Sequence, residues 1–166
     1  MKIIRNKFGS CRPIGGFTML EMMIIVVIIG IVAAIAAPTF FSAGPRLKAR
    51  TEARNVLNMV RLARSKAISD GSQYGVYVDG ANRQYILFKD ISNPTLMAYD
   101  GADSIVTGPE SIQPDVVANT SFTGNTVVFM STGRASQSGN FTFDISGGGA
   151  LYTVSILAST GRSKLQ

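Results

Sequence analysis

The chain has 166 residues, of which 46% are hydrophobic and only 16% are charged, a composition too apolar for a disordered protein. It contains no histidine and one cysteine. Zinc sites built on histidine or several cysteines, Ser-His-Asp triads, Cys-His dyads and intrachain disulfides are therefore excluded. We expect a non-enzymatic protein that uses no cofactor and no metal ion.

The net charge of +6 comes from two short segments. Residues 1–16 hold four basic residues and no acid, and residues 46–66 hold seven basic residues and one acid, Glu52. Residues 67–166 hold five basic and eight acidic residues, a net charge of −3. The predicted globular part is thus mildly acidic, which argues against a general nucleic-acid-binding domain.

Residues 17–37 predict a transmembrane helix. As a helix these residues would extend roughly 31 Å, about the thickness of the hydrocarbon core of a membrane. The basic residues before them place residues 1–16 in the cytoplasm and the rest of the chain outside it. Two alternatives to a permanent membrane anchor are signal peptides that are removed by cleavage. One is a secretory signal peptide with an A-x-A cleavage site at residues 34–36, and the other is a lipoprotein signal that ends at Cys11. The lipoprotein signal fails because no apolar stretch precedes Cys11.

Glu21 argues against an ordinary secretory signal. A carboxylate inside an apolar segment costs roughly 2.5–3.5 kcal/mol near the bilayer centre, so it usually has a partner. Cleavage between Gly16 and Phe17 would give Phe17 an α-amino group of the opposite charge. On a neighbouring copy, that amine lies at the right depth to pair with Glu21. The sequence therefore predicts a charge pair that operates during assembly.

The run from Gly16 to Glu21, Gly-Phe-Thr-Met-Leu-Glu, after a basic leader and before an apolar helix resembles the type IV pilin and type II secretion pseudopilin family. The resemblance implies cleavage after Gly16 by prepilin peptidase, N-methylation of Phe17, and packing of a helix over residues 17–69 into the core of a helical filament. It also implies other pilin or pseudopilin subunits and an inner-membrane assembly platform as partners. The chain would be a single-pass inner-membrane protein with a cytoplasmic leader and a periplasmic carboxyl-terminal domain, assembled into a periplasm-spanning filament.

Glycine and proline residues interrupt this helix at two places. Gly30 and Pro38 predict a kink or local opening, although both residues are also simply tolerated in membrane helices. Gly44-Pro45 predicts a break, with proline in the first turn of the next helical segment.

The second half of the helix is expected to be amphipathic. Its apolar stripe, which should pack on the globular domain, consists of Ala53, Val56, Val60, Ala63 and Ala67. The adjacent arginine stripe consists of Arg46, Arg50, Arg54, Arg61 and Arg64. We consider three interpretations of this stripe: a solvated face near lipid headgroups, a contact with acidic residues of neighbouring subunits, and a contact with DNA phosphates.

Residues 70–166 predict a β-rich domain, because the apolar period changes from 3.6 to 2 after Asp70-Gly71. The expected strands cover residues 74–79, 83–89, 126–130, 140–145 and 151–158. Residues 91–125 are expected to form a long loop with at most a short strand at 116–118. The fold class is therefore α+β: a long amino-terminal helix, transmembrane in its first half and amphipathic in its second, packed on an antiparallel sheet or sandwich.

A short repeat, Ser-Thr-Gly-Arg, occurs at residues 131–134 and again at 159–162. Each copy follows an apolar strand, which predicts a turn with glycine at positive φ and an outward-facing arginine. The pattern over residues 50–166 resembles the GspH/FimT branch of the family. This branch comprises the minor pseudopilin of type II secretion and related minor type IV pilins.

The resulting hypothesis is a minor pseudopilin, a structural subunit of the type II secretion pseudopilus. The alternative is a FimT-like minor type IV pilin that acts in pilus assembly or DNA uptake. Some FimT-like relatives carry a Gly-Arg-x-Arg end; here residues 161–164 read Gly-Arg-Ser-Lys, which keeps the charge but loses one bidentate group. Arg134, Arg162 and Lys164 are the candidate contacts for DNA or a partner. The sequence does not separate the two systems.

Overall fold

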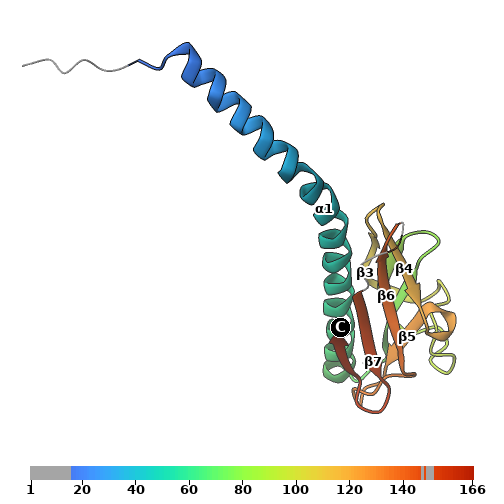
Figure 1. Cartoon of the computed structure of the whole chain (residues 1–166). Coiled ribbons are helices and arrows are strands. Elements are labelled where there is room, and N and C mark those ends of the chain that lie inside the picture. Colours follow the sequence, from blue (N-terminus) through green and yellow to red (C-terminus); the bar gives the residue numbers. More distant parts are fainter. Residues whose placement is uncertain (1–15, 147, 149–151) are drawn as a thin grey trace, which may run out of the picture. The chain divides into compact units, whose positions relative to one another are not determined.

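A computed structural model describes residues 16–146, 148 and 152–166, without the side chains of residues 38–43 (Figure 1). The leader up to residue 15, with Cys11, lies outside the described residues. The chain divides into two compact units, Met1–Phe40 and Phe41–Gln166.

Helix α1 extends over Met19–Asp70 and links the two units. The break expected at Gly44-Pro45 is wrong, because both residues are helical. A proline inside a helix removes one backbone hydrogen bond, and α1 accommodates that loss here without ending. Gly30 and Pro38 are helical as well, and a kink at these two residues stays a prediction.

In the first unit, the helical segment Met19–Ala37 is long and apolar enough to cross a membrane. Its mean hydropathy is 2.8, and none of it is buried within the chain. The α-helical backbone suits such an environment, since the helix itself satisfies the amides that follow its first turn.

The second unit contains two antiparallel four-stranded sheets. The first has the order β3-β2-β1-β5, with β1 at Tyr74–Asp79, β2 at Gln84–Lys89, β3 at Ser104–Ser111 and β5 at Thr126–Phe129. The second has the order β4-β6-β7-β8, with β4 at Val116–Thr120, β6 at Gly139–Ile145, β7 at Tyr152–Leu157 and β8 at Arg162–Leu165. A short 3₁₀ helix, η1, covers Thr123–Asn125. The expected α+β fold class is confirmed.

The core of this unit lies between α1 and the two sheets. All five residues of the predicted apolar stripe are fully buried there, as are Phe129, Phe141 and Phe143 from the strands. Figure 1 shows this part of α1 alongside the strands. The predicted packing of the apolar stripe on the globular domain is confirmed. Burial of each large apolar side chain contributes on the order of 1.5–3 kcal/mol.

Three strands differ from the expectation. Residues 91–125 contain β3 and a longer β4 in addition to loops, and β8 follows the second Ser-Thr-Gly-Arg turn. β3 is an edge strand with mostly exposed residues and Pro109 inside it, so it shows no alternating pattern. β8 has only four residues and also lies at a sheet edge, where exposed and partly buried positions alternate.

Candidate functional site

The amino-terminal segment places the predicted cleavage point just before the start of a helix. Gly16 and Phe17 are exposed, and α1 begins at Met19. The Thr18 hydroxyl oxygen accepts a hydrogen bond from the Glu21 N–H, with an N···O distance of 3.2 Å. This bond caps the helix and satisfies one of its free amide groups. Thr18 was not singled out from the sequence, although Thr-x-x-Glu is the signature of a capping box.

Glu21 lies in the first turn of α1 and is exposed. A negative charge at this position interacts favourably with the positive end of the helix dipole. The apolar side chains that follow are exposed throughout, including Ile24, Val27 and Ile31. A continuous apolar surface of this size needs lipid or other helices to cover it. Glu21 therefore lies at the start of a helical segment whose apolar surface requires contact with lipid or with other helices.

The two Ser-Thr-Gly-Arg turns of the second unit pack against each other. Gly133 has a φ of 79° and Gly161 a φ of 63°, which confirms the expected positive φ at both glycines. A Cβ atom on Gly161 would lie only 2.0 Å from the carbonyl oxygen of Gly133. The contact between the two turns therefore requires glycine at position 161.

Arg64 of α1 connects the helix to both turns. Its Nε donates a hydrogen bond to the Gly133 carbonyl oxygen at 3.0 Å, and the side chain is half-buried. A Cβ atom on Gly161 would come within 3.0 Å of the same Nε. Arg64 was predicted only as a member of the arginine stripe. Its partner is 69 residues away, and no local pattern in the sequence indicates that contact.

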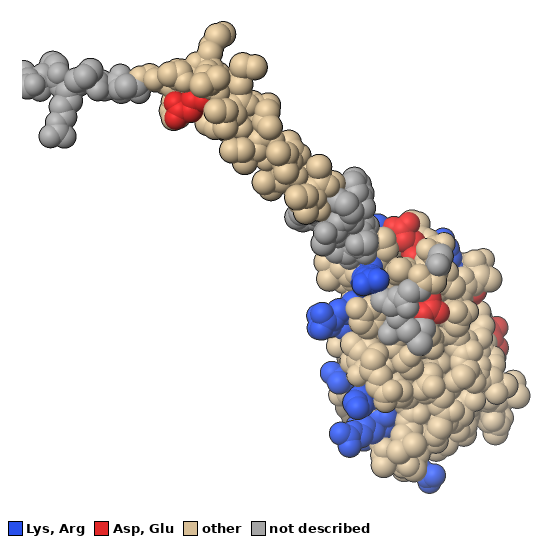
Figure 2. Space-filling view, viewed as in Figure 1, with Lys and Arg blue, Asp and Glu red and all other residues tan. Residues whose placement is uncertain are grey.

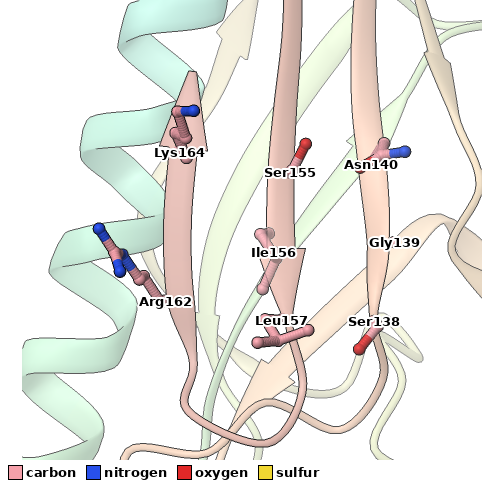
Figure 3. Close-up of a pocket in the computed structure, with 8 residues that line it drawn as sticks. All are labelled: Ser138, Gly139, Asn140, Ser155, Ile156, Leu157, Arg162 and Lys164. Carbon is pink, nitrogen blue, oxygen red and sulfur yellow. The ribbon is translucent and has the colours of Figure 1, made fainter. Parts of the chain in front are cut away.

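β8 brings Arg162 and Lys164 together on one face of its sheet. These residues alternate with Ser163 and Leu165, and they lie opposite Leu157 and Ser155 of β7. Together they line one side of a groove of about 670 Å³ (Figure 3). The other lining residues come from β6, β7 and the segment before β6: Ser138, Gly139, Asn140, Ser155, Ile156 and Leu157. Arg134 is exposed but does not line this groove, so the structure groups only two of the three predicted basic contacts.

The residues of the arginine stripe other than the half-buried Arg64 form an exposed basic surface on α1. Figure 2 shows a row of basic side chains along one side of the folded domain. Glu52 is the single acid among residues 46–66, and it points away from the stripe. It is only 3% exposed, and its Oε1 accepts a hydrogen bond of 3.4 Å from the Gln113 N–H. Burial raises the pKa of Tyr85 to about 12, and the charge of Glu52 adds to the shift. Glu52 thus belongs to the interior, and the ion pair found among the described residues, Lys48–Asp115, involves none of these arginines.

The chemical groups at these sites are suited to binding. Within residues 16–146, 148 and 152–166, no group of three or more histidine, cysteine, aspartate or glutamate side chains could hold a metal ion. The basic residues of β8 and α1 can bind anions, and the apolar helix can bind lipid or other helices.

Known protein families match both the amino-terminal segment and the β-rich domain of the chain. The family model described as "Type II transport protein GspH" matches residues 52–160, and that of the "Prokaryotic N-terminal methylation motif" matches residues 11–37. The type IV major pilin protein PilA of Myxococcus xanthus is 39% identical over 64 residues, a match that covers 39% of this chain and 29% of the relative. The chain thus aligns with less than a third of that pilin.

Two kinds of solved structure share the fold. The minor pseudopilin EpsH from the type 2 secretion system of Vibrio cholerae matches with a TM-score of 0.58 and 12% identity, covering 72% of this chain and 96% of that one. The type IV minor pilin FimU of Pseudomonas aeruginosa matches with a TM-score of 0.56 and 15% identity, covering 73% and 90%. At these identities the likeness concerns the fold alone.

An apolar amino-terminal helix with a methylation motif, continuing into an amphipathic helix packed on antiparallel sheets, defines a pilin-like protein. Because the GspH model matches more than half of the chain, the chain belongs to the GspH family of type II transport proteins.

Proposed function

We propose that this protein is a minor pseudopilin, a non-enzymatic structural subunit of the type II secretion pseudopilus. Prepilin peptidase cuts it between Gly16 and Phe17, and Phe17 is then N-methylated. The mature chain stays in the inner membrane through residues 17–37, with its β-rich domain in the periplasm. The observation that carries this proposal is the position of Glu21, in the first helical turn of an exposed apolar span and four residues after the predicted new amino terminus.

Assembly follows from the cost of an uncompensated charge. In the membrane, the Glu21 carboxylate of a single subunit lies in an apolar environment and lacks a cation from another subunit, its own Phe17 amine being four residues earlier in the chain. The Phe17 amine of an adjacent subunit supplies that cation, so association removes an unfavourable charge from an apolar environment. The apolar surfaces of the helices are covered at the same time.

Replacement of Glu21 by alanine tests this proposal. Cleavage should remain intact, because the residues on either side of the cut are unchanged, and incorporation into filaments should fall. Both quantities can be measured on full-length protein in cells, by immunoblot of the membrane and of sheared filaments. Gln113→Ala is the control, since Gln113 is an exposed residue of similar size that carries no charge and lies outside the apolar helix. Incorporation of the Glu21 variant at the level of this control would contradict the proposal.

A second candidate function is that of a minor type IV pilin that binds DNA weakly. The observation in its favour is the groove beside β8, where Arg162 and Lys164 lie together and none of the lining residues is acidic. Two phosphate contacts would give a salt slope of roughly −0.9 per phosphate on duplex DNA, and therefore shallow affinity. Titration of labelled DNA should then show binding at low salt that an Arg162→Ala, Lys164→Ala double variant loses. Binding unchanged in that variant would reject this candidate.

A further inference from the structure

A second basic cavity lies between α1 and β8, on the helix side of Arg162. Its volume is about 400 Å³, and its lining consists of Arg61, Arg64, Ser65, Ile68, Arg162 and Ser163. We call it the arginine cleft. Three guanidinium groups from two separate elements line it, together with two hydroxyl groups and one aliphatic side chain. Guanidinium groups bind planar oxyanions through paired hydrogen bonds, and hydroxyl groups can add further donors.

The arginine cleft is held in place by the contacts between the turns. Arg64 is oriented by its bond to the Gly133 carbonyl, which uses Nε and leaves the terminal nitrogens of the guanidinium group for another partner. Packing of Gly161 on Gly133 fixes the start of β8 and so brings Arg162 beside the helix. At least one of the three arginines is therefore pre-organised, which lowers the entropic cost of binding an anion.

The charges of the arginine cleft have no counterpart among the residues that line it. No acidic residue is in its lining, and the ion pair found among the described residues joins Lys48 and Asp115. Three like charges in one cavity repel one another, and a bound anion removes that repulsion. The arrangement is typical of a site that is completed by an acidic partner.

We propose that the arginine cleft binds a carboxylate-bearing segment of the neighbouring subunit in the filament. This inference rests on the assembly proposed above. The charge of the chain itself supports a protein partner: residues 46–66 carry +6, whereas residues 67–166 carry −3. Exposed acids such as Asp100 and Glu110 lie in the β-rich part. Subunits that share this separation of charge present an acidic surface to a basic one when they stack. The same acids repel the extended phosphate backbone of DNA.

The test uses full-length protein in nanodiscs of zwitterionic phosphatidylcholine, so that the lipid contributes no net charge. The probe is a fluorescent ten-residue polyglutamate peptide, with polyglutamine as the uncharged reference. The test variant combines Arg61→Ala with Arg162→Ala. The matched control combines Arg54→Ala with Lys164→Ala, which also removes one cation from the helix and one from β8 but leaves the arginine cleft intact. Thermal unfolding of both variants establishes that they are folded.

We expect the polyglutamate dissociation constant to rise at least tenfold in the test variant and less than threefold in the control at 150 mM salt. Equal losses in both variants would overturn the proposal, because they indicate general attraction to a basic surface. Tighter binding of a duplex DNA of equal charge, with the same dependence on Arg61, would also overturn it in favour of a nucleic-acid site. Binding is measured on unassembled protein, so a negative result leaves the Glu21 test of assembly unaffected.

Discussion

Replacement of Gly161 by alanine is expected to destabilise the folded domain strongly. A left-handed conformation costs an alanine about 1–2 kcal/mol, and Gly161 has a φ of 63°. The new Cβ would lie 2.0 Å from the Gly133 carbonyl oxygen, whereas ordinary contacts begin at 3.4 Å. The turn must therefore shift by more than 1 Å. That shift weakens the bond between Arg64 and Gly133, and hydrogen bonds to charged groups contribute about 1.5–3 kcal/mol.

The sum of these contributions is a loss of about 3 kcal/mol in the free energy of unfolding. For a domain of this size it corresponds to a fall of roughly 10 °C or more in the midpoint of thermal unfolding. The assay is circular dichroism of a fragment that covers residues 46–166. Gly71→Ala is the matched control, because Gly71 has a φ of 62° and no atom within 4 Å of an added Cβ. The control should lose about 1 kcal/mol, from backbone strain alone.

The difference between the two variants isolates the packing of the two turns. If Gly161→Ala and Gly71→Ala lower the midpoint equally, the turns do not pack as described and Arg64 does not link them to the helix. A lower midpoint for the control than for Gly161→Ala would refute the reasoning outright.

Three further outcomes follow from the sequence and structure. Gly16→Arg should leave full-length precursor in the membrane, visible by immunoblot, because the small residue before the cut is lost. Asp90→Asn should raise the thermal midpoint at pH 7 by a few degrees. Asp90 is 5% exposed, and neither of its carboxylate oxygens has a hydrogen-bond partner among the described residues. Burial raises the pKa of Asp90, and the charges of Asp103 and Asp100 add to the shift. Because the pKa of Asp90 is raised in the folded state, the stability of the wild-type chain falls as the pH rises through that pKa. The increase in midpoint caused by Asp90→Asn should therefore become smaller toward acidic pH. An increase that does not depend on pH would contradict a destabilising Asp90 carboxylate. The domain of residues 46–166 should be a folded, largely β monomer by circular dichroism and light scattering.

The sequence predicted the helix and the central strands well, for identifiable reasons. The apolar stripe of α1 follows the helical period over several turns, and each of its five residues is fully buried. Strands β1, β2, β6 and β7 have one face or both faces in the core, so their apolar residues alternate or cluster. A strand can be predicted from a sequence when its buried face requires apolar residues, and these four strands are largely buried.

Edge strands and long-range contacts could not be predicted in this way. β3 at one sheet edge is largely exposed, and β8 at another is short and partly charged, so neither carries a strong pattern. The repeat at residues 131–134 and 159–162 correctly predicted two glycine turns, but not that the turns touch each other and Arg64. Those contacts depend on how the two sheets are placed around the helix. The amino-terminal motif stands apart, because its chemistry is local and can be read from a few adjacent residues.

The mass of the mature chain tests the central claim most directly. Full-length protein expressed in its natural host can be extracted from membranes, and its intact mass and amino-terminal sequence can then be measured. A pilin-like subunit must begin at Phe17, with the mass of one methyl group added to its amine. A mature chain that begins at Ala37, after the A-x-A sequence of residues 34–36, would lack Glu21 and the apolar helix and would contradict the account.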